Sequence, residues 1–301
     1  MRDFNFSNAF MHFSRTDGPS GFVWKYVLSY GFTLVALLIA YTFLLGGAAF
    51  ALLGQSAEPN PLVGSSGFFA LAPLLVFPII LLFNAVFEAA CQRRYLRGDG
   101  FRLRLGGDEW RLFVVYIIWL AFMIGYYMLI AIIAAAFSGG EGPSFEAGRN
   151  AGPVVGLLII AFSAVWVFLA VRFAPAGALT VRDRAIRFRS AWRVTRGRFW
   201  TLFGSYLVLV VAVFLFYLLL TVAFGLLYSS LLAAGLAASD NPNGSLGVFG
   251  SPGMLISFGL LYLCCFFAYG WFVFVWAGPA ALAARTDPER ASMDNPAAAF
   301  Q

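Results

Sequence analysis

Three polar side chains lie within long apolar runs, and they are the residues of this sequence best placed to do chemistry. Glu88 follows Asn84 by one helical turn, so both would share one face of a helix, and Arg172 lies near the end of another apolar run. A charge at the centre of a bilayer costs about 2.5–3.5 kcal/mol, so charged side chains there are usually paired or functional. We therefore predict a polar cluster of Asn84, Glu88 and Arg172. The alternative is that Glu88 and Arg172 lie near enough to the membrane surface to reach water.

Other residues that commonly do chemistry are sparse. His12 is the single histidine, which excludes a histidine-based metal site or catalytic triad. The three cysteines, Cys91, Cys264 and Cys265, lack the spacing of metal ligands, and no glycine-rich phosphate loop occurs. The sequence therefore predicts no catalytic residue, no metal, no cofactor and no nucleic-acid partner.

A second group of candidate residues lies in the arginine-rich segment 182–199. At roughly 100° per residue, Phe188, Trp192 and Phe199 fall on one stripe, and arginines cover the rest of the circumference. This pattern predicts an interfacial helix, with its rings toward the acyl chains and its guanidinium groups on the phosphates of anionic phospholipid headgroups. The alternative is that the segment only sets topology and depth in the bilayer. The arginines of this predicted lipid face are Arg182, Arg184, Arg187, Arg189, Arg193, Arg196 and Arg198.

A short motif spans the end of this segment. Residues 190–204 read SAWRVTRGRFWTLFG, which resembles the signature SW-x-LTRG-x-FW-x-LFG of a broad group of bacterial six-helix inner-membrane proteins. That group includes the membrane domain fused to some glycerophosphoryl diester phosphodiesterases. The resemblance implies a helical membrane module. It transfers no catalytic residue, because the chemistry of those fusions belongs to a separate soluble domain that has no counterpart in these 301 residues.

The elements that must position these residues are membrane-spanning helices. Hydrophobic residues make up 61% of the chain and charged residues 11%, whereas a soluble domain carries about 25% charged residues. A helix needs about 20 apolar residues to cross a bilayer, because it rises about 1.5 Å per residue. The sequence thus predicts an all-α polytopic membrane bundle of about six transmembrane helices, at 24–53, 68–90, 112–137, 154–180, 202–236 and 254–284.

The basic residues alternate between the two sides of these six runs. Nineteen of the 20 lysines and arginines lie before or at the start of the first run, in or around the connections from the second to the third and from the fourth to the fifth run, or after the sixth, and the remaining loops contain Arg149 alone. The positive-inside rule then places both termini in the cytoplasm. We expect a multi-pass protein of a bacterial inner (plasma) membrane.

An aromatic pattern recurs at the start of every second helix. The spacing W-x5-Y-x10-Y predicts three tandem helical hairpins in one orientation, with each tryptophan at the headgroup boundary. Its copies are Trp24/Tyr30/Tyr41, Trp110/Tyr116/Tyr127 and Trp200/Tyr206/Tyr217. The predicted organisation is one transmembrane domain with a cytoplasmic amphipathic segment (1–22), hairpins at 24–90, 110–180 and 200–284, an interfacial helix (182–199) and a cytoplasmic tail (285–301).

These features favour a non-enzymatic membrane module that organises lipids or a partner complex through its arginine-rich face. Three hairpins could instead enclose a path, so a carrier of small solutes or lipids is the alternative. A membrane enzyme is disfavoured because no acid–base set is visible. A carrier requires a polar, water-filled cavity near the midplane, whereas a module of the first kind requires a packed, dry bundle.

The charge distribution predicts that Arg97 and Arg193 are cytoplasmic and that Glu141 is not. Single cysteines at these positions, in a chain whose three natural cysteines are replaced by serine, can be tested with a membrane-impermeant maleimide. Glu141→Cys should react in intact cells, and Arg97→Cys and Arg193→Cys only after the membrane is opened. Labelling of Arg193→Cys in intact cells would overturn the topology.

Overall fold

The computed structural model describes residues 4–16, 18–53, 66–137, 145–237 and 252–287, so Glu141 lies outside the described residues. Within these ranges the regular structure is helical, and six helices are long and apolar enough to cross a membrane. The predicted all-α class is confirmed. The six helices are α3 (Phe22–Leu53), α4 (Ser66–Arg97), α5 (Gly107–Phe137), α6 (Phe145–Phe173), α9 (Phe199–Ala237) and α11 (Pro252–Arg285).

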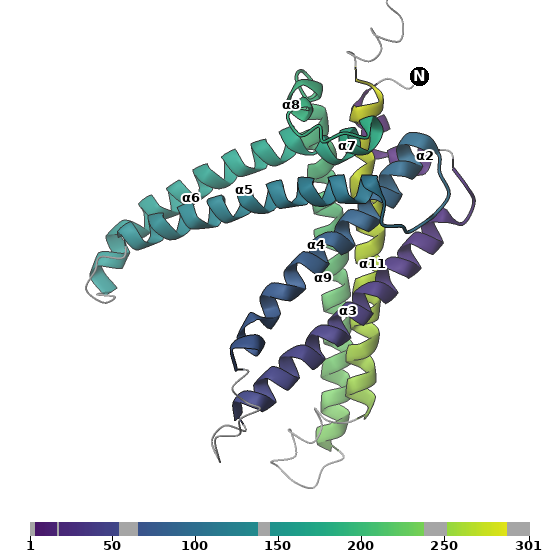
Figure 1. The fold of residues 1–301 in the computed structure, drawn as a ribbon. Coiled ribbons are helices and arrows are strands. Elements are labelled where there is room, and N and C mark those ends of the chain that lie inside the picture. Colours follow the sequence, from purple (N-terminus) through teal and green to yellow (C-terminus); the bar gives the residue numbers. More distant parts are fainter. Residues whose placement is uncertain (1–3, 17, 54–65, 138–144, 238–251, 288–301) are drawn as a thin grey trace, which may run out of the picture.

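Short helices gather at one end of the bundle, which we call the arginine-rich end (Figure 1). This end comprises the short helices, the loops 98–106 and 184–198, the starts of α3, α5 and α9 and the final turns of α4 and α11. It therefore holds most of the arginines of the described residues. The short helices are α1 (Phe6–Phe10), α2 (His12–Arg15), α7 (Ala176–Asp183) and α8 (Ser190–Val194).

An aromatic core lies where α3, α4 and α11 meet. Tyr26 and Tyr30 of α3, Phe87 of α4 and Phe274 of α11 are almost completely buried. Their ring centroids lie 4.9 Å apart for Tyr30–Phe87 and 5.7 Å for Tyr26–Phe274. Lipid is as apolar as these rings, so close packing rather than the hydrophobic effect holds such helices together. Each aromatic pair adds about 0.5–1.5 kcal/mol.

Consecutive long helices pack in pairs, namely α3 with α4, α5 with α6 and α9 with α11. In Figure 1 the α5–α6 pair leaves the other four helices at a wide angle. The tryptophans of the aromatic pattern are all exposed, with exposed fractions of 72% for Trp24, 53% for Trp110 and 77% for Trp200. Their exposure fits anchors at a membrane boundary. The similarity of the three hairpins and a common depth of the indoles stay predictions.

The segment 182–199 is not the single helix that its amphipathic spacing predicts. Helix α7 ends at Asp183, Arg184 has a left-handed backbone (φ 51°), and α8 contains only five residues. The reason is the packing of Phe188, whose ring stacks on Phe173 of α6 with centroids 4.6 Å apart. Burying this ring between α5 and α6 draws the chain out of helical geometry. Phe188 is buried and five of the seven arginines are exposed, but turns and not one helix produce this arrangement.

A proline explains why α7 is separate from α6. Helix α6 ends at Phe173 and α7 begins at Ala176, directly after Pro175, whose ring removes a backbone donor and disfavours a continuous helix. Residues 176–181 of α7 are fully buried. Helix α7 contacts α4, α5 and α11 there, so it packs inside the arginine-rich end.

Two acids in the first turn of α5 fasten the end of α4. The Arg93 guanidinium donates to Glu109, and both side chains are buried, with exposed fractions of 3% and 0%. The next turn of α4 adds Arg97, whose Nη1 lies 3.1 Å from Asp108 Oδ2. Acids also suit this position because the amino end of a helix carries partial positive charge, and Glu109 Oε2 accepts the backbone N–H of Gly106 at 2.9 Å.

Removing Glu109 should destabilise the protein strongly, because Arg93 would stay buried without its carboxylate. Breaking a buried pair from one side costs about 3–5 kcal/mol. We expect Glu109→Gln to lower the free energy of unfolding by that amount in dodecyl sulfate titrations followed by tryptophan fluorescence. Arg104→Gln is the control, because Arg104 is more than half exposed and lies 3.9 Å from the same carboxylate; its effect should stay below about 1 kcal/mol. Equal losses of unfolding free energy in Glu109→Gln and Arg104→Gln would contradict a stabilising role of the buried Arg93–Glu109 pair.

Candidate functional site

The structure brings Asn84 and Glu88 onto the inner side of α4 but places Arg172 elsewhere. Glu88 Oε2 accepts a hydrogen bond from the Tyr116 hydroxyl, and Asn84 Oδ1 accepts one from the Tyr30 hydroxyl at 3.3 Å. Among the described residues Glu88 has no cation within ion-pair distance. The predicted cluster of three is therefore wrong in its third member, because hydroxyl donors of α3 and α5 take the place of the guanidinium.

Arg172 lies in a box of three aromatic rings. Its Cζ is 5.2 Å from the ring centroid of Phe168, 5.1 Å from Trp192 and 5.4 Å from Phe199. Two of its nitrogens, Nε and Nη1, are buried without a hydrogen-bond partner in the described chain. The ring faces stabilise the cation by about 0.5–2 kcal/mol. Arg172 thereby ties α6 to α8 and to the start of α9, a structural role.

The predicted lipid face divides into two groups of arginines. Arg182 is held inside the protein, with its Nε 2.7 Å from Asp183 and its Nη2 3.1 Å from Asp287. Arg198 donates to Thr286 Oγ1 at 3.0 Å, and partial burial lowers its pKa while Asp287 raises it. The other five are exposed, and we call them the arginine belt: Arg184, Arg187, Arg189, Arg193 and Arg196.

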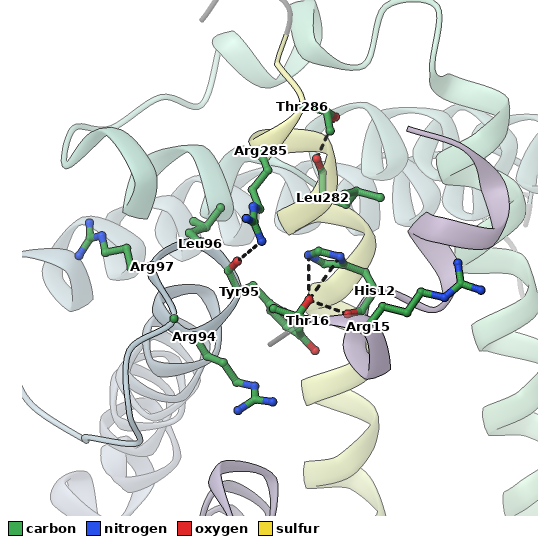
Figure 2. A pocket seen from close by; sticks show the side chains of 11 residues that line it. His12, Arg15, Thr16, Arg94, Tyr95, Leu96, Arg97, Leu282, Arg285 and Thr286 are labelled. Atoms are coloured by element: carbon green, nitrogen blue, oxygen red, sulfur yellow. Dashed lines mark hydrogen bonds between the residues drawn. The ribbon is translucent and has the colours of Figure 1, made fainter. Parts of the chain in front are cut away.

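A cavity of about 560 Å³ opens where α2 meets the final turns of α4 and α11 (Figure 2). Sequence reasoning did not predict it. Its polar lining is basic or neutral, and no carboxylate lines it among the described residues. Four arginines, a histidine and two threonines contribute: Arg15, Arg94, Arg97, Arg285, His12, Thr16 and Thr286.

Hydrogen bonds and ring contacts fix the wall of this cavity. The buried His12 ring stacks on the ring of Tyr95 with centroids 5.4 Å apart, and the Tyr95 hydroxyl donates to the carbonyl of Phe274 at 2.8 Å. Thr16 Oγ1 donates to the His12 carbonyl at 2.7 Å. In Figure 2, His12 and Arg285 point toward each other across the cavity. The wall is therefore held by α2, α4 and α11 together.

The arginines of the cavity differ in how their charges are balanced. Arg97 pairs with Asp108. Arg94 and Arg285 donate instead to neutral backbone carbonyls, those of Pro19 at 3.3 Å and of Tyr95 at 3.2 Å. Neither has a carboxylate within ion-pair distance among the described residues. Two positive charges of the cavity are thus left without an acidic partner there.

The sequence contains only part of the signal for this cavity. Basic residues at the ends of α4 and α11 are visible in it, but nothing in their spacing shows that His12 and Thr16 fold back over them. Comparison of the chain with known protein families, with curated proteins and with solved structures found no match.

The aromatic box predicts that Trp192 holds α8 in place. Trp192→Ala removes one ring face from Arg172 and the ring contact with Phe173, centroids 5.7 Å apart. We expect amide hydrogen exchange in residues 190–198 to accelerate by about tenfold, because a cation–ring contact contributes about 0.5–2 kcal/mol and an aromatic pair about 0.5–1.5 kcal/mol. Arg189→Gln, on the exposed side, should leave exchange unchanged. If residues 190–198 exchange at the same rate in Trp192→Ala and Arg189→Gln, Trp192 does not hold α8 in place.

Proposed function

We propose that this protein is a non-enzymatic membrane module that binds anionic phospholipids with its arginine-rich end. The arginine belt is the observation that carries the proposal. Its five exposed arginines lie on a segment, residues 184–199, without a single Asp or Glu. A juxtamembrane arginine gains about 1 kcal/mol from an anionic leaflet, so five together favour an anionic surface strongly over a neutral one.

The surroundings of the belt support a location at the headgroups. Trp24, Trp110 and Trp200 are exposed near the starts of α3, α5 and α9, at the same end of the bundle as the belt. Indole rings prefer the headgroup boundary, and the excess of basic residues assigns this end to the cytoplasmic leaflet. Lipid phosphates of that leaflet would then lie beside the belt. We propose that the termini are cytoplasmic and the membrane a bacterial inner membrane.

Two acids of the described chain lie near the belt and are already engaged. Asp183 and Asp287 both bind Arg182, and Asp183 also lies 3.6 Å from Arg187 of the belt. An exposed guanidinium binds phosphate in bidentate geometry, which an ammonium group cannot do. Phosphates of the leaflet are therefore the partners that the belt fits.

A carrier is the second candidate, and Glu88 is the observation that favours it. A carboxyl group within a span, bonded to a tyrosine hydroxyl and without a cation nearby, is typical of proton relays. The aromatic core argues against it, because the rings of α3, α4 and α11 fill the space between those helices. Dissipation of a pH gradient in sealed vesicles that Glu88→Gln abolishes would favour the carrier.

Lipid selectivity of the whole protein tests the proposal. The protein is reconstituted into phosphatidylcholine bilayers, and the association of trace spin-labelled phosphatidylglycerol is compared with that of spin-labelled phosphatidylcholine by electron paramagnetic resonance. We expect a preference for phosphatidylglycerol that falls as salt is added, because salt screens exposed charges.

Two variants of the belt separate charge from structure. Replacing all five arginines by glutamine should remove the preference for phosphatidylglycerol, whereas replacing them by lysine should retain most of it. The protein should stay folded in both, because the five side chains are exposed. Equal association of the two lipids with the unmodified protein would overturn the proposal.

A further inference from the structure

We propose that the cavity between α2, α4 and α11 is a binding site for a phosphate monoester group, distinct from the arginine belt. The inference rests on the proposed function only in taking the ligand to be anionic. Its evidence is separate, because the two unbalanced charges of the cavity come from Arg94 and Arg285. Neither residue belongs to the segment that carries the belt.

The floor of the cavity is a buried cation. Arg94 is only 7% exposed, and its Nε is buried without a hydrogen-bond partner in the described chain. Its guanidinium lies over the ring of Phe22, with Cζ 4.7 Å from the centroid, which compensates part of the lost hydration. A buried charge without an opposite charge is costly. An anion bound in the cavity would offset that cost by pairing with the guanidinium of Arg94. The folded protein therefore favours binding of an anion at this position.

The rim supplies the second cation. Arg285 is exposed and points into the cavity, and Arg15 and Arg97 extend outward from it in Figure 2. Thr16 and Thr286 also line the cavity, and their hydroxyl groups donate to the carbonyls of His12 and Leu282. The donors for a ligand are therefore the guanidinium groups of Arg94 and Arg285, which bind phosphate by charge-assisted hydrogen bonds.

The number of unbalanced charges selects the class of phosphate. A phosphate monoester carries about −1.5 to −2 charges at neutral pH, which matches Arg94 and Arg285 together. A phosphate diester carries one negative charge and would balance only one of them. The volume of about 560 Å³ lies within the range of small-molecule sites, about 300–1,000 Å³, so a headgroup fits as well as free phosphate.

Native mass spectrometry of the full chain in detergent micelles tests the proposal with three probes: dioctanoyl phosphatidic acid, dioctanoyl phosphatidylglycerol and inorganic phosphate. Phosphatidic acid presents a monoester and phosphatidylglycerol a diester. We expect one saturable site for phosphatidic acid with at least about tenfold higher affinity than for phosphatidylglycerol, because one charge-assisted interaction contributes about that factor.

Three variants locate the site. Arg285→Gln, at an exposed position, should weaken phosphatidic acid by about tenfold, since it removes one such interaction. Arg94→Lys keeps the buried charge and loses the planar fork, so it should weaken binding while preserving the fold. The belt variant with five glutamines should keep the saturable site, even where it loses the general preference for anionic lipid. The proposal for the belt and the proposal for the cavity can therefore fail independently, because each has its own readout.

Each outcome decides the question. Competition of inorganic phosphate with phosphatidic acid assigns the site to a free phosphate group, and saturable binding of phosphatidic acid without such competition assigns it to a lipid headgroup. Both results support a site for a phosphate group with two negative charges. Absence of saturable binding of both phosphatidic acid and inorganic phosphate overturns the proposal. So does equal affinity for phosphatidic acid and phosphatidylglycerol, or binding that Arg285→Gln and Arg94→Lys leave unchanged.

Discussion

The ion pair between Arg93 and Glu109 is the interaction on which the arginine-rich end depends. Both side chains are buried, and neither charge could stay there alone without a penalty of several kcal/mol. The pair fixes the last turns of α4 against the first turn of α5. One turn further on, Arg97 binds Asp108 and also donates to the carbonyl of Val181 in α7. The acids of α5 thereby position α7 as well.

From α7 the same principle extends to α11 and produces the two candidate surfaces. Arg182 joins Asp183 to Asp287 and donates to the carbonyl of Ala284, so the end of α11 is drawn against α7. Asp108, Glu109, Asp183 and Asp287 of this end are thus all paired with arginines. Other arginines of this end either project outward, as in the belt, or line the cavity, where Arg94 and Arg285 have backbone carbonyls as acceptors. The distribution of a few carboxylates thus decides which arginines remain available to phosphate.

The sequence predicts the long helices well because lipid imposes one rule on every span, an apolar run of about 20 residues. It predicts less where tertiary contacts compete. The spacing of Phe188 and Trp192 indicates a helix, but the stacking of Phe188 on Phe173 outweighs that preference. The position of Arg172 and Glu88 in apolar runs predicts that they share a cluster, whereas the fold surrounds Arg172 with aromatic rings. The cavity depends on His12 and Arg285, which come from opposite ends of the chain and line it together, and no local pattern encodes that arrangement.

An experimental density map of the protein in a lipid nanodisc that contains phosphatidic acid and phosphatidylglycerol tests the central claim most directly. That claim is that the arginines of the cavity and of the arginine belt bind phosphate at one membrane surface. It predicts phosphate density within hydrogen-bonding distance of Arg94 and Arg285, and headgroup density beside Arg189 and Arg193 in the same leaflet. A map in which a carboxylate of the chain itself contacts both Arg94 and Arg285, with the belt turned away from the headgroups, would contradict it.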